Sequence, residues 1–240
     1  MSRPVTLITG ANRGIGRATA ERLARDGHHV IGLARHAPAD GFPGEFVEVD
    51  LLDAALTGQV LSDITARHEV DHLVNNAGLT TSSTLEQTSV EELDRILALN
   101  MRAPMQCVQA CVPAMKRKGR GAIVNIASRA ALGMIKRTAY AGAKSGLIGF
   151  TRTWALELGP YGITVNAIAP GPVLTELYKK NNPMDEEAAR RFTDRIPLKR
   201  MGQPEDIAGS IAYFLSDDAR FVTGQVLYVC GGLSLGASPT

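Results

Sequence analysis

Short apolar runs alternate with longer segments of helical periodicity from one end of the chain to the other. Most of the runs are rich in β-branched residues, and they therefore predict buried strands. The expected strands are residues 5–8, 29–34, 46–49, 71–74, 122–127, 163–168 and 226–229. Helices are expected between them, at about residues 53–68, 90–118 and 140–158, after a glycine-rich turn near residue 14, and up to about residue 215. This alternation predicts an α/β fold, a doubly wound parallel β-sheet flanked by helices on both faces.

Two segments interrupt the alternation. Residues 35–45 contain two prolines and two glycines, and we predict a loop there in place of a crossover helix. Residues 176–204 are charged and broken, and we expect them to form a lid on the substrate side. No internal repeat or linker divides the chain, so residues 1–240 are expected to form a single domain.

The charge balance and the cysteine count exclude several classes of protein. The 26 basic residues nearly balance the 24 acidic ones, which argues against a nucleic-acid-binding protein and a polybasic membrane anchor. No apolar run is long enough for a membrane span, and the N-terminus has no signal-peptide design. Three cysteines form no disulfide framework, so a cytoplasmic protein is expected, with Cys107 and Cys111 as buried thiols more readily than metal ligands.

A glycine-rich loop connects the first expected strand to the first expected helix. Its sequence is Thr9-Gly10-Ala11-Asn12-Arg13-Gly14-Ile15-Gly16. In this context the glycines predict a cradle for a dinucleotide pyrophosphate at the helix N-terminus, and hence a Rossmann-type sheet. Gly10 allows a tight turn, Gly14 lets the backbone approach the pyrophosphate, and Gly16 permits close helix packing. The alternative is a turn and helix cap that bind no ligand.

The end of the second expected strand indicates which dinucleotide is bound. NAD-preferring folds usually place an acidic residue there, whereas this chain has Ala34 followed by Arg35, with Arg13 in the facing loop. Two guanidinium groups suit a 2′-phosphate, so NADP(H) is predicted over NAD(H), unless both arginines are only surface charge. Asp50, at the end of the third strand, could accept a hydrogen bond from the adenine amino group or cap the next helix.

Tyr140 and Lys144 are four residues apart and share one helix face. A lysine cation beside the phenol would ease its deprotonation, which a tyrosine with a pKa of about 10 requires near neutrality. The spacing alone is weak, since a core-edge tyrosine and a solvated lysine give the same pattern. Ser128 ends the fifth expected strand, and Asn100 stands inside an expected helix, where asparagine needs local hydrogen bonds.

Together these motifs resemble the short-chain dehydrogenase/reductase family over essentially the whole chain. The markers are the glycine loop, Asn75-Asn76-Ala77-Gly78, Asn100, Ser128, Tyr140 with Lys144, Asn166, and Pro170-Gly171 with Thr175. Within the family the chain looks most like NADPH-dependent 3-oxoacyl-carrier-protein reductases, and it is also similar to dihydrodiol dehydrogenases of siderophore biosynthesis. It departs from the common pattern in having one residue fewer between Ser128 and Tyr140, and Cys230 in place of an aspartate.

The resemblance implies a role for each marker. Tyr140 would be the general acid in ketone reduction and the base in reverse, while Lys144 would lower its pKa and hold the nicotinamide ribose. Ser128 would orient the carbonyl oxygen, Asn100 would support a water chain to Lys144, and Thr175 would hold the carboxamide. The remaining expected cofactor residues are Asn12, Ile15, Asp50, Leu51, Asn76, Ala77, Gly78, Pro170, Gly171 and Val173.

The resemblance also implies a function, an NADP(H)-dependent ketone reductase or secondary-alcohol dehydrogenase, assembled as a homotetramer. One alternative is a 3-oxoacyl-thioester reductase, and another is a catalytically silent nucleotide-binding regulator, against which the complete catalytic set argues. Members of the family of this type need no catalytic metal. The five histidines form no metal pattern, so no metal site is expected.

The substrate is less clearly indicated than the cofactor. Arg129, Lys136 and Arg137, with the basic residues of the lid, predict a rim that attracts an anionic substrate or an acidic carrier protein. A solvated surface of mixed charge explains the same residues equally well. The candidates for an apolar pocket wall are Leu132, Met134, Leu174, Leu177 and Tyr178.

Overall fold

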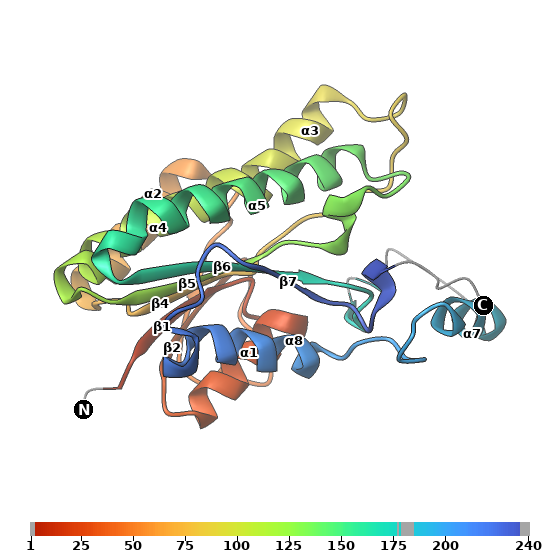
Figure 1. Ribbon diagram of the computed structural model, residues 1–240. Helices are drawn as coiled ribbons and strands as arrows, with labels where there is room; N and C mark the ends of the chain where they lie inside the picture. The colour runs from red at the N-terminus through yellow and green to blue at the C-terminus, as the bar shows by residue number, and fades with distance from the viewer. Residues whose placement is uncertain (1–2, 177, 179–184, 236–240) are drawn as a thin grey trace.

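A seven-stranded sheet forms the centre of the molecule (Figure 1). The computed structural model describes residues 3–176, 178 and 185–235. The strands are β1 (Val5–Thr9), β2 (His29–Ala34), β3 (Glu45–Glu48), β4 (His72–Asn75), β5 (Gly121–Ile126), β6 (Ile163–Pro170) and β7 (Val226–Val229). They pair in the order β3-β2-β1-β4-β5-β6-β7, and all pairs are parallel. The predicted strands are confirmed, and residues 35–44 form the predicted loop.

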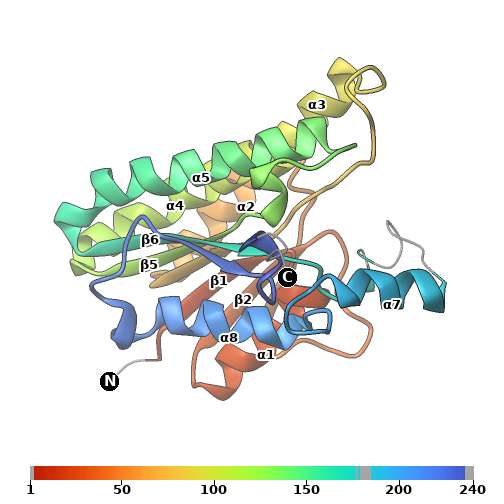
Figure 2. The ribbon, with the colours of Figure 1, turned by 45° about the vertical axis from the view of Figure 1, so that its right-hand side comes forward.

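Helices cover both faces of the sheet (Figure 1, Figure 2). One face carries α1 (Gly14–Arg25) and α8 (Pro204–Leu215), which contact each other closely. The other face carries α2 (Ala54–Arg67), α4 (Ala103–Lys118) and α5 (Thr138–Leu158), and α3 (Val90–Leu97) extends that layer beyond the sheet. The predicted doubly wound, Rossmann-type α/β fold is therefore confirmed.

Successive residues of a strand fill two separate cores, because side chains alternate between the faces of a sheet. In β1, Leu7 belongs to the core beneath α2, α4 and α5, while Ile8 belongs to the core beneath α1 and α8. Cys107 and Cys111 lie in the first of these cores as free thiols. Burial raises the pKa of the Cys107 thiol to about 12, and the prediction of buried thiols is confirmed.

The helix predicted at residues 90–118 consists of three consecutive parts. A π-helical turn, η1 (Ala98–Arg102), connects α3 to α4. Asn100 lies within that turn and is fully buried. Single π-helical turns of this kind occur often at functional sites, because they alter the direction of one side chain in an otherwise regular helix.

Two predictions are wrong in their local detail. Residues 176–204 are not broken throughout, because α7 (Glu186–Asp194) forms behind the Asp185 carboxylate, which accepts a hydrogen bond of 2.7 Å from the Ala188 amide. The N-cap alternative for Asp50 also fails. Asp53 caps α2, whereas Asp50 accepts a hydrogen bond of 3.0 Å from the Leu52 amide.

The strand order reverses direction between β1 and β4, the two central neighbours. At such a point the loops after the two strands run to opposite faces, and they leave a crevice outside the carboxyl ends of the strands. The glycine loop follows β1, and residues 76–78 follow β4, so both border this crevice. Within the described ranges, no helix combines the length and apolar character that a membrane crossing requires.

Candidate active site

The glycine loop has a backbone that only glycine adopts easily. Gly10 and Gly14 have φ angles of +66° and +56°, in the left-handed region. A Cβ on Gly16 would lie 2.2 Å from the Gly10 carbonyl oxygen, so a side chain there would displace the loop. The loop thus places the N-terminus of α1 against the crevice with no side chain between them, which suits a pyrophosphate.

The loop after β4 is fastened to the glycine loop by side-chain hydrogen bonds. The Asn76 amide nitrogen Nδ2 donates to the carbonyl oxygens of Thr9 and Gly10, at 2.9 and 3.0 Å. The Thr9 hydroxyl in turn accepts from the backbone amides of Asn76 and Ala77, both at 3.0 Å. Asn76 and Ala77, which were predicted as cofactor residues, therefore connect the loop after β4 to the glycine loop after β1.

The segment after β6 also lies beside the glycine loop. A Cβ on Gly14 would lie 3.2 Å from Cγ2 of Thr175, so the predicted carboxamide-binding residue lies directly beside the glycine loop. Val173 forms a parallel bridge with Gly202, which fixes the direction of this segment. Gly171 lies so close to Cys230 that a Cβ would be 2.7 Å from its Cα atom.

The end of the crevice that is predicted to hold the adenosine lies beside β2 and β3. The Val49 amide donates to the Ala34 carbonyl at 2.9 Å, which brings the segment with Asp50 and Leu51 beside the end of β2. Arg35 is exposed directly after β2, and it has no ion pair within the described residues. Arg13 is also exposed and lies 3.5 Å from the Glu176 carboxylate, so a bound phosphate would compete with that carboxylate for Arg13.

Lys144 is 3% exposed, an unusual burial for an ammonium group. Its Nζ donates to the Ile126 carbonyl at 2.7 Å and lies 5.7 Å from the centre of the Tyr140 ring. Burial lowers the pKa of Lys144 to about 8, so the charge of this group changes close to neutrality. A solvated lysine, the alternative that the spacing left open, is excluded.

Ser128 and Tyr140 are neighbours, as predicted, although they are distant in the chain. Desolvation by the surrounding protein raises the pKa of the Tyr140 phenol above its ordinary value. A hydrogen bond from the Ser128 side chain and the Arg137 charge lower this pKa by less than desolvation raises it. Lys144 is bonded to the Ile126 carbonyl in this arrangement, and its effect on the Tyr140 pKa stays a prediction.

Asn100 completes the group from the π-helical turn. Its Nδ2 donates to the carbonyl oxygens of Leu79 and Ile96, at 3.0 and 2.9 Å, which confirms the expected local hydrogen bonding. Its Oδ1 is buried without a protein partner. A Cβ on Gly78 would lie 2.9 Å from that Oδ1 and 3.5 Å from Lys144 Nζ, so both groups border the same point. An unpaired acceptor there suits the expected water chain.

The predicted basic rim is only partly formed. Arg137 donates to the Thr81 carbonyl, so it holds the loop after β4 as well as contributing charge. In the lid, Arg191 pairs with Glu187 and Arg200 pairs with Asp206, so these charges are locally balanced. Lys179, Lys180 and Leu177 lie outside the described residues. Leu132 and Met134 are exposed, and Tyr178 is half-buried in the field of two arginines, which leaves the apolar wall a prediction.

Three contributors to the site were missed from the sequence. They are the Thr9 hydroxyl, the Ile126 carbonyl and the contact of Arg137 with Thr81. A threonine at the end of β1 was visible as a signal, since a hydroxyl next to a glycine loop has backbone groups to bind. A backbone carbonyl has no sequence signal at all.

The fold and the site together define a class of protein. A dinucleotide cradle beside adjacent serine, tyrosine and lysine side chains is the arrangement of an oxidoreductase that interconverts CH–OH and C=O groups with a nicotinamide cofactor. A family model described as enoyl-(acyl carrier protein) reductase matches residues 10–234. The chain belongs to the short-chain dehydrogenase/reductase family.

Individual relatives cover nearly the whole chain. A (2S)-((R)-hydroxy(phenyl)methyl)succinyl-CoA dehydrogenase subunit, BbsD of Thauera aromatica, is 40% identical over 96% of both chains. The 3-oxoacyl-(acyl-carrier-protein) reductase of Thermotoga maritima is 36% identical over 95% of this chain and 97% of its own. A putative NAD(P)-dependent gluconate 5-dehydrogenase from Beutenbergia cavernae, solved with NADP, is 35% identical over 98% of both chains with a TM-score of 0.92.

Proposed function

We propose that this protein is an NADP(H)-dependent reductase of ketones, or a secondary-alcohol dehydrogenase in the reverse direction. The observation that carries the proposal is the juxtaposition of Ser128, Tyr140 and the buried Lys144 at the edge of a glycine-lined crevice. A binding protein needs the crevice, but it does not need three proton-exchanging groups beside it.

The site residues divide the chemistry between them. A nicotinamide dinucleotide held by the glycine loop would supply the hydride in reduction and accept it in oxidation. Ser128 donates a hydrogen bond to the carbonyl oxygen, and Tyr140 gives its proton to the same oxygen as the alcohol forms. Lys144 then provides a positive charge beside the phenolate, and the unpaired Oδ1 of Asn100 accepts a hydrogen bond from water that returns the proton.

The preference for NADP(H) rests on charge at the end of β2. Arg35 and Arg13 are exposed there, and no carboxylate occupies position 34. The Beutenbergia cavernae neighbour contains NADP, whereas a 4-hydroxyisoleucine dehydrogenase with 29% identity is complexed with NADH, so the family uses both. Losing a charge-assisted hydrogen bond costs about 1.5–3 kcal/mol, so Arg35→Ser should weaken NADPH binding about 10- to 150-fold. Arg25→Ser, on exposed α1 surface, is the matched control.

The second candidate is a thioester-linked substrate. The Thauera aromatica and Thermotoga maritima relatives are named for a CoA thioester that carries a secondary alcohol and for a 3-oxoacyl carrier protein. Burial raises the pKa of Tyr178, and the nearby positive charges of Arg129 and Arg137 lower it by less, so both arginines lie close to Tyr178. Lys136→Glu should raise KM for anionic ketones and leave neutral ones unchanged. Lys136 is a cleaner choice than Arg137, whose loss would release Thr81.

The deciding experiment measures initial rates of NADPH and NADH oxidation with a 3-oxoacyl thioester, a neutral diketone, a keto acid and an aldehyde. Tyr140→Phe removes only the phenolic hydroxyl, and Tyr213→Phe removes an exposed hydroxyl on α8 as a control. NADPH turnover that is lost in Tyr140→Phe and kept in Tyr213→Phe supports the proposal. NADPH binding without turnover of any substrate favours a silent nucleotide-binding protein, and faster turnover with NADH refutes the role of Arg35.

We also propose a homotetramer. Leu85 before α3, Val90 on α3 and Leu156 on α5 are 72%, 68% and 80% exposed. Large apolar side chains exposed on helices are typical of surfaces that a second copy of the chain covers. On the open edge of the sheet, β7 exposes Leu227. Light scattering coupled to size exclusion would measure the mass, and a monomer at micromolar concentration would refute the assembly.

A further inference from the structure

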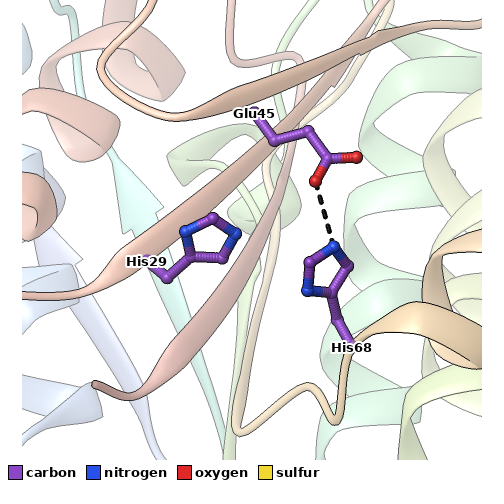
Figure 3. A group of neighbouring side chains, drawn as sticks. All are labelled: His29, Glu45 and His68. Carbon is purple, nitrogen blue, oxygen red and sulfur yellow. Dashed lines mark hydrogen bonds and ion pairs between the residues drawn. The ribbon is translucent and has the colours of Figure 1, made fainter. Parts of the chain in front are cut away.

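Two of the five histidines come together with a glutamate (Figure 3). His29 is the first residue of β2, Glu45 is the first residue of β3, and His68 follows the last residue of α2. In parallel strands the first residues lie at one end and the cofactor crevice lies at the other. The cluster is therefore separate from the proposed catalytic site, and it does not depend on the proposed function.

The three side chains converge from separate elements. One potential ligand atom from each lies within 4.8 Å of the others. His68 Nε2 and Glu45 Oε2 are 3.0 Å apart, and the rings of His29 and His68 have centroids 5.3 Å apart at 32°. Ligands at about 2.0 Å from a tetrahedral metal are about 3.3 Å apart, so small side-chain rotations would form three ligand positions.

His29 has a feature that the ion pair between His68 and Glu45 does not explain. Its Nε2 is buried and has no hydrogen-bond partner. Burial of a polar nitrogen without a partner is costly, and such atoms usually have a water or an ion near them. The ring lies beside the hydrogen-bonded pair, in the position from which a third ligand would come.

We propose that His29, Glu45 and His68 bind a divalent transition metal of the Zn²⁺ type. Two imidazoles and one carboxylate are a ligand set that Zn²⁺ accepts, with a fourth position left for water. Arg67 supports the set, because its Nη2 lies 2.8 Å from the second oxygen of Glu45 and orients the carboxylate. Within the described residues, this is the one group of three such side chains with ligand spacing.

The position gives the metal a structural effect. β3 is a four-residue strand at the edge of the sheet and pairs only with β2. A metal on these three ligands would join the start of that strand to its neighbour and to the end of α2. The spacing of the histidines in the sequence shows no metal pattern. The fold brings residues 29, 45 and 68 together from separate elements, which that spacing does not reveal.

The test adds Zn²⁺ in slight molar excess to the full-length protein, in a buffer without chelating components. We expect saturable binding of one Zn²⁺ per chain by calorimetry and a rise in Tm, since a ligand that binds only the folded state stabilises it. His29→Gln and His68→Gln should lose both effects. His36→Gln, which removes an exposed imidazole at the opposite end of β2, should keep both.

Two further measurements separate a site from weak surface binding and from misfolded variants. Mg²⁺ at the same concentration should leave Tm unchanged, because Mg²⁺ prefers oxygen ligands. Co²⁺ added to the wild-type chain should give the intense visible absorption of a four-coordinate ion. Absence of saturable Zn²⁺ binding, equal binding in His29→Gln and wild type, or a weak six-coordinate Co²⁺ spectrum would overturn the proposal.

Discussion

The contact between Gly78 and Asn100 allows the proposed proton path to be tested by adding one methyl group. In Gly78→Ala, the new Cβ would lie 2.9 Å from Asn100 Oδ1, closer than a carbon normally approaches an oxygen. The Asn100 side chain cannot move freely, because its Nδ2 holds the carbonyl oxygens of Leu79 and Ile96. The methyl group must therefore distort one of these hydrogen bonds or displace the water expected beside Oδ1.

The size of the effect follows from the bond that is disturbed. A typical hydrogen bond contributes about 1 kcal/mol net, which corresponds to about a fivefold change in a rate constant. We expect kcat to fall about five- to tenfold in Gly78→Ala. The added atom points toward Asn100 and Lys144, away from the glycine loop, so the Kd for NADPH should change less than kcat.

The assay is steady-state reduction of the best substrate, with NADPH binding followed separately by fluorescence titration. Gly58→Ala is the control, because its Cβ meets nothing within 4 Å and alanine stabilises a helix by roughly 0.5–1 kcal/mol. In a double-mutant cycle, Gly78→Ala should add little to Asn100→Ala, since both act at one point. Additive effects of the two substitutions, or an unchanged kcat, would refute the reasoning.

Three further predictions concern other groups. Burial lowers the pKa of Lys144 to about 8, so kcat/KM should fall as pH rises through about 8 and the ammonium is lost, and Lys144→Arg should remove that limb of the profile. Burial lowers the pKa of His72 from 6.5 to about 4, so as the pH falls the unfolded chain binds this proton before the folded protein does. The free energy of unfolding is therefore unaffected by His72 above pH 6.5, and it falls by up to about 3 kcal/mol as the pH decreases toward 4. In His72→Gln, the free energy of unfolding measured between pH 6.5 and pH 4 should depend less on pH than in the wild type. Gly16→Ala places a Cβ 2.2 Å from the Gly10 oxygen, so NADPH binding measured by titration should be lost, and binding as in Gly58→Ala would contradict the cradle.

The strands and most helices could be predicted because each depends on a local pattern. Short apolar runs, β-branched residues and the glycines before α1 are features of a few consecutive residues, and the observed strands differ from the predicted ones by no more than two positions. The N-cap of α2 depends on a finer detail, because Asp53, and not Asp50, reaches an unpaired helix amide. The family pattern in the sequence was sufficient to assign the class of enzyme.

The tertiary structure alone decided which side chains meet and in what electrostatic surroundings. The pKa of Lys144 depends on its burial, and its bond to Ile126 joins residues 18 positions apart. Contacts between Gly14 and Thr175, or between His29 and His68, cross the sheet or connect different elements. Sequence spacing contains periodicity along one element, whereas distances and desolvation arise only when separate elements pack together.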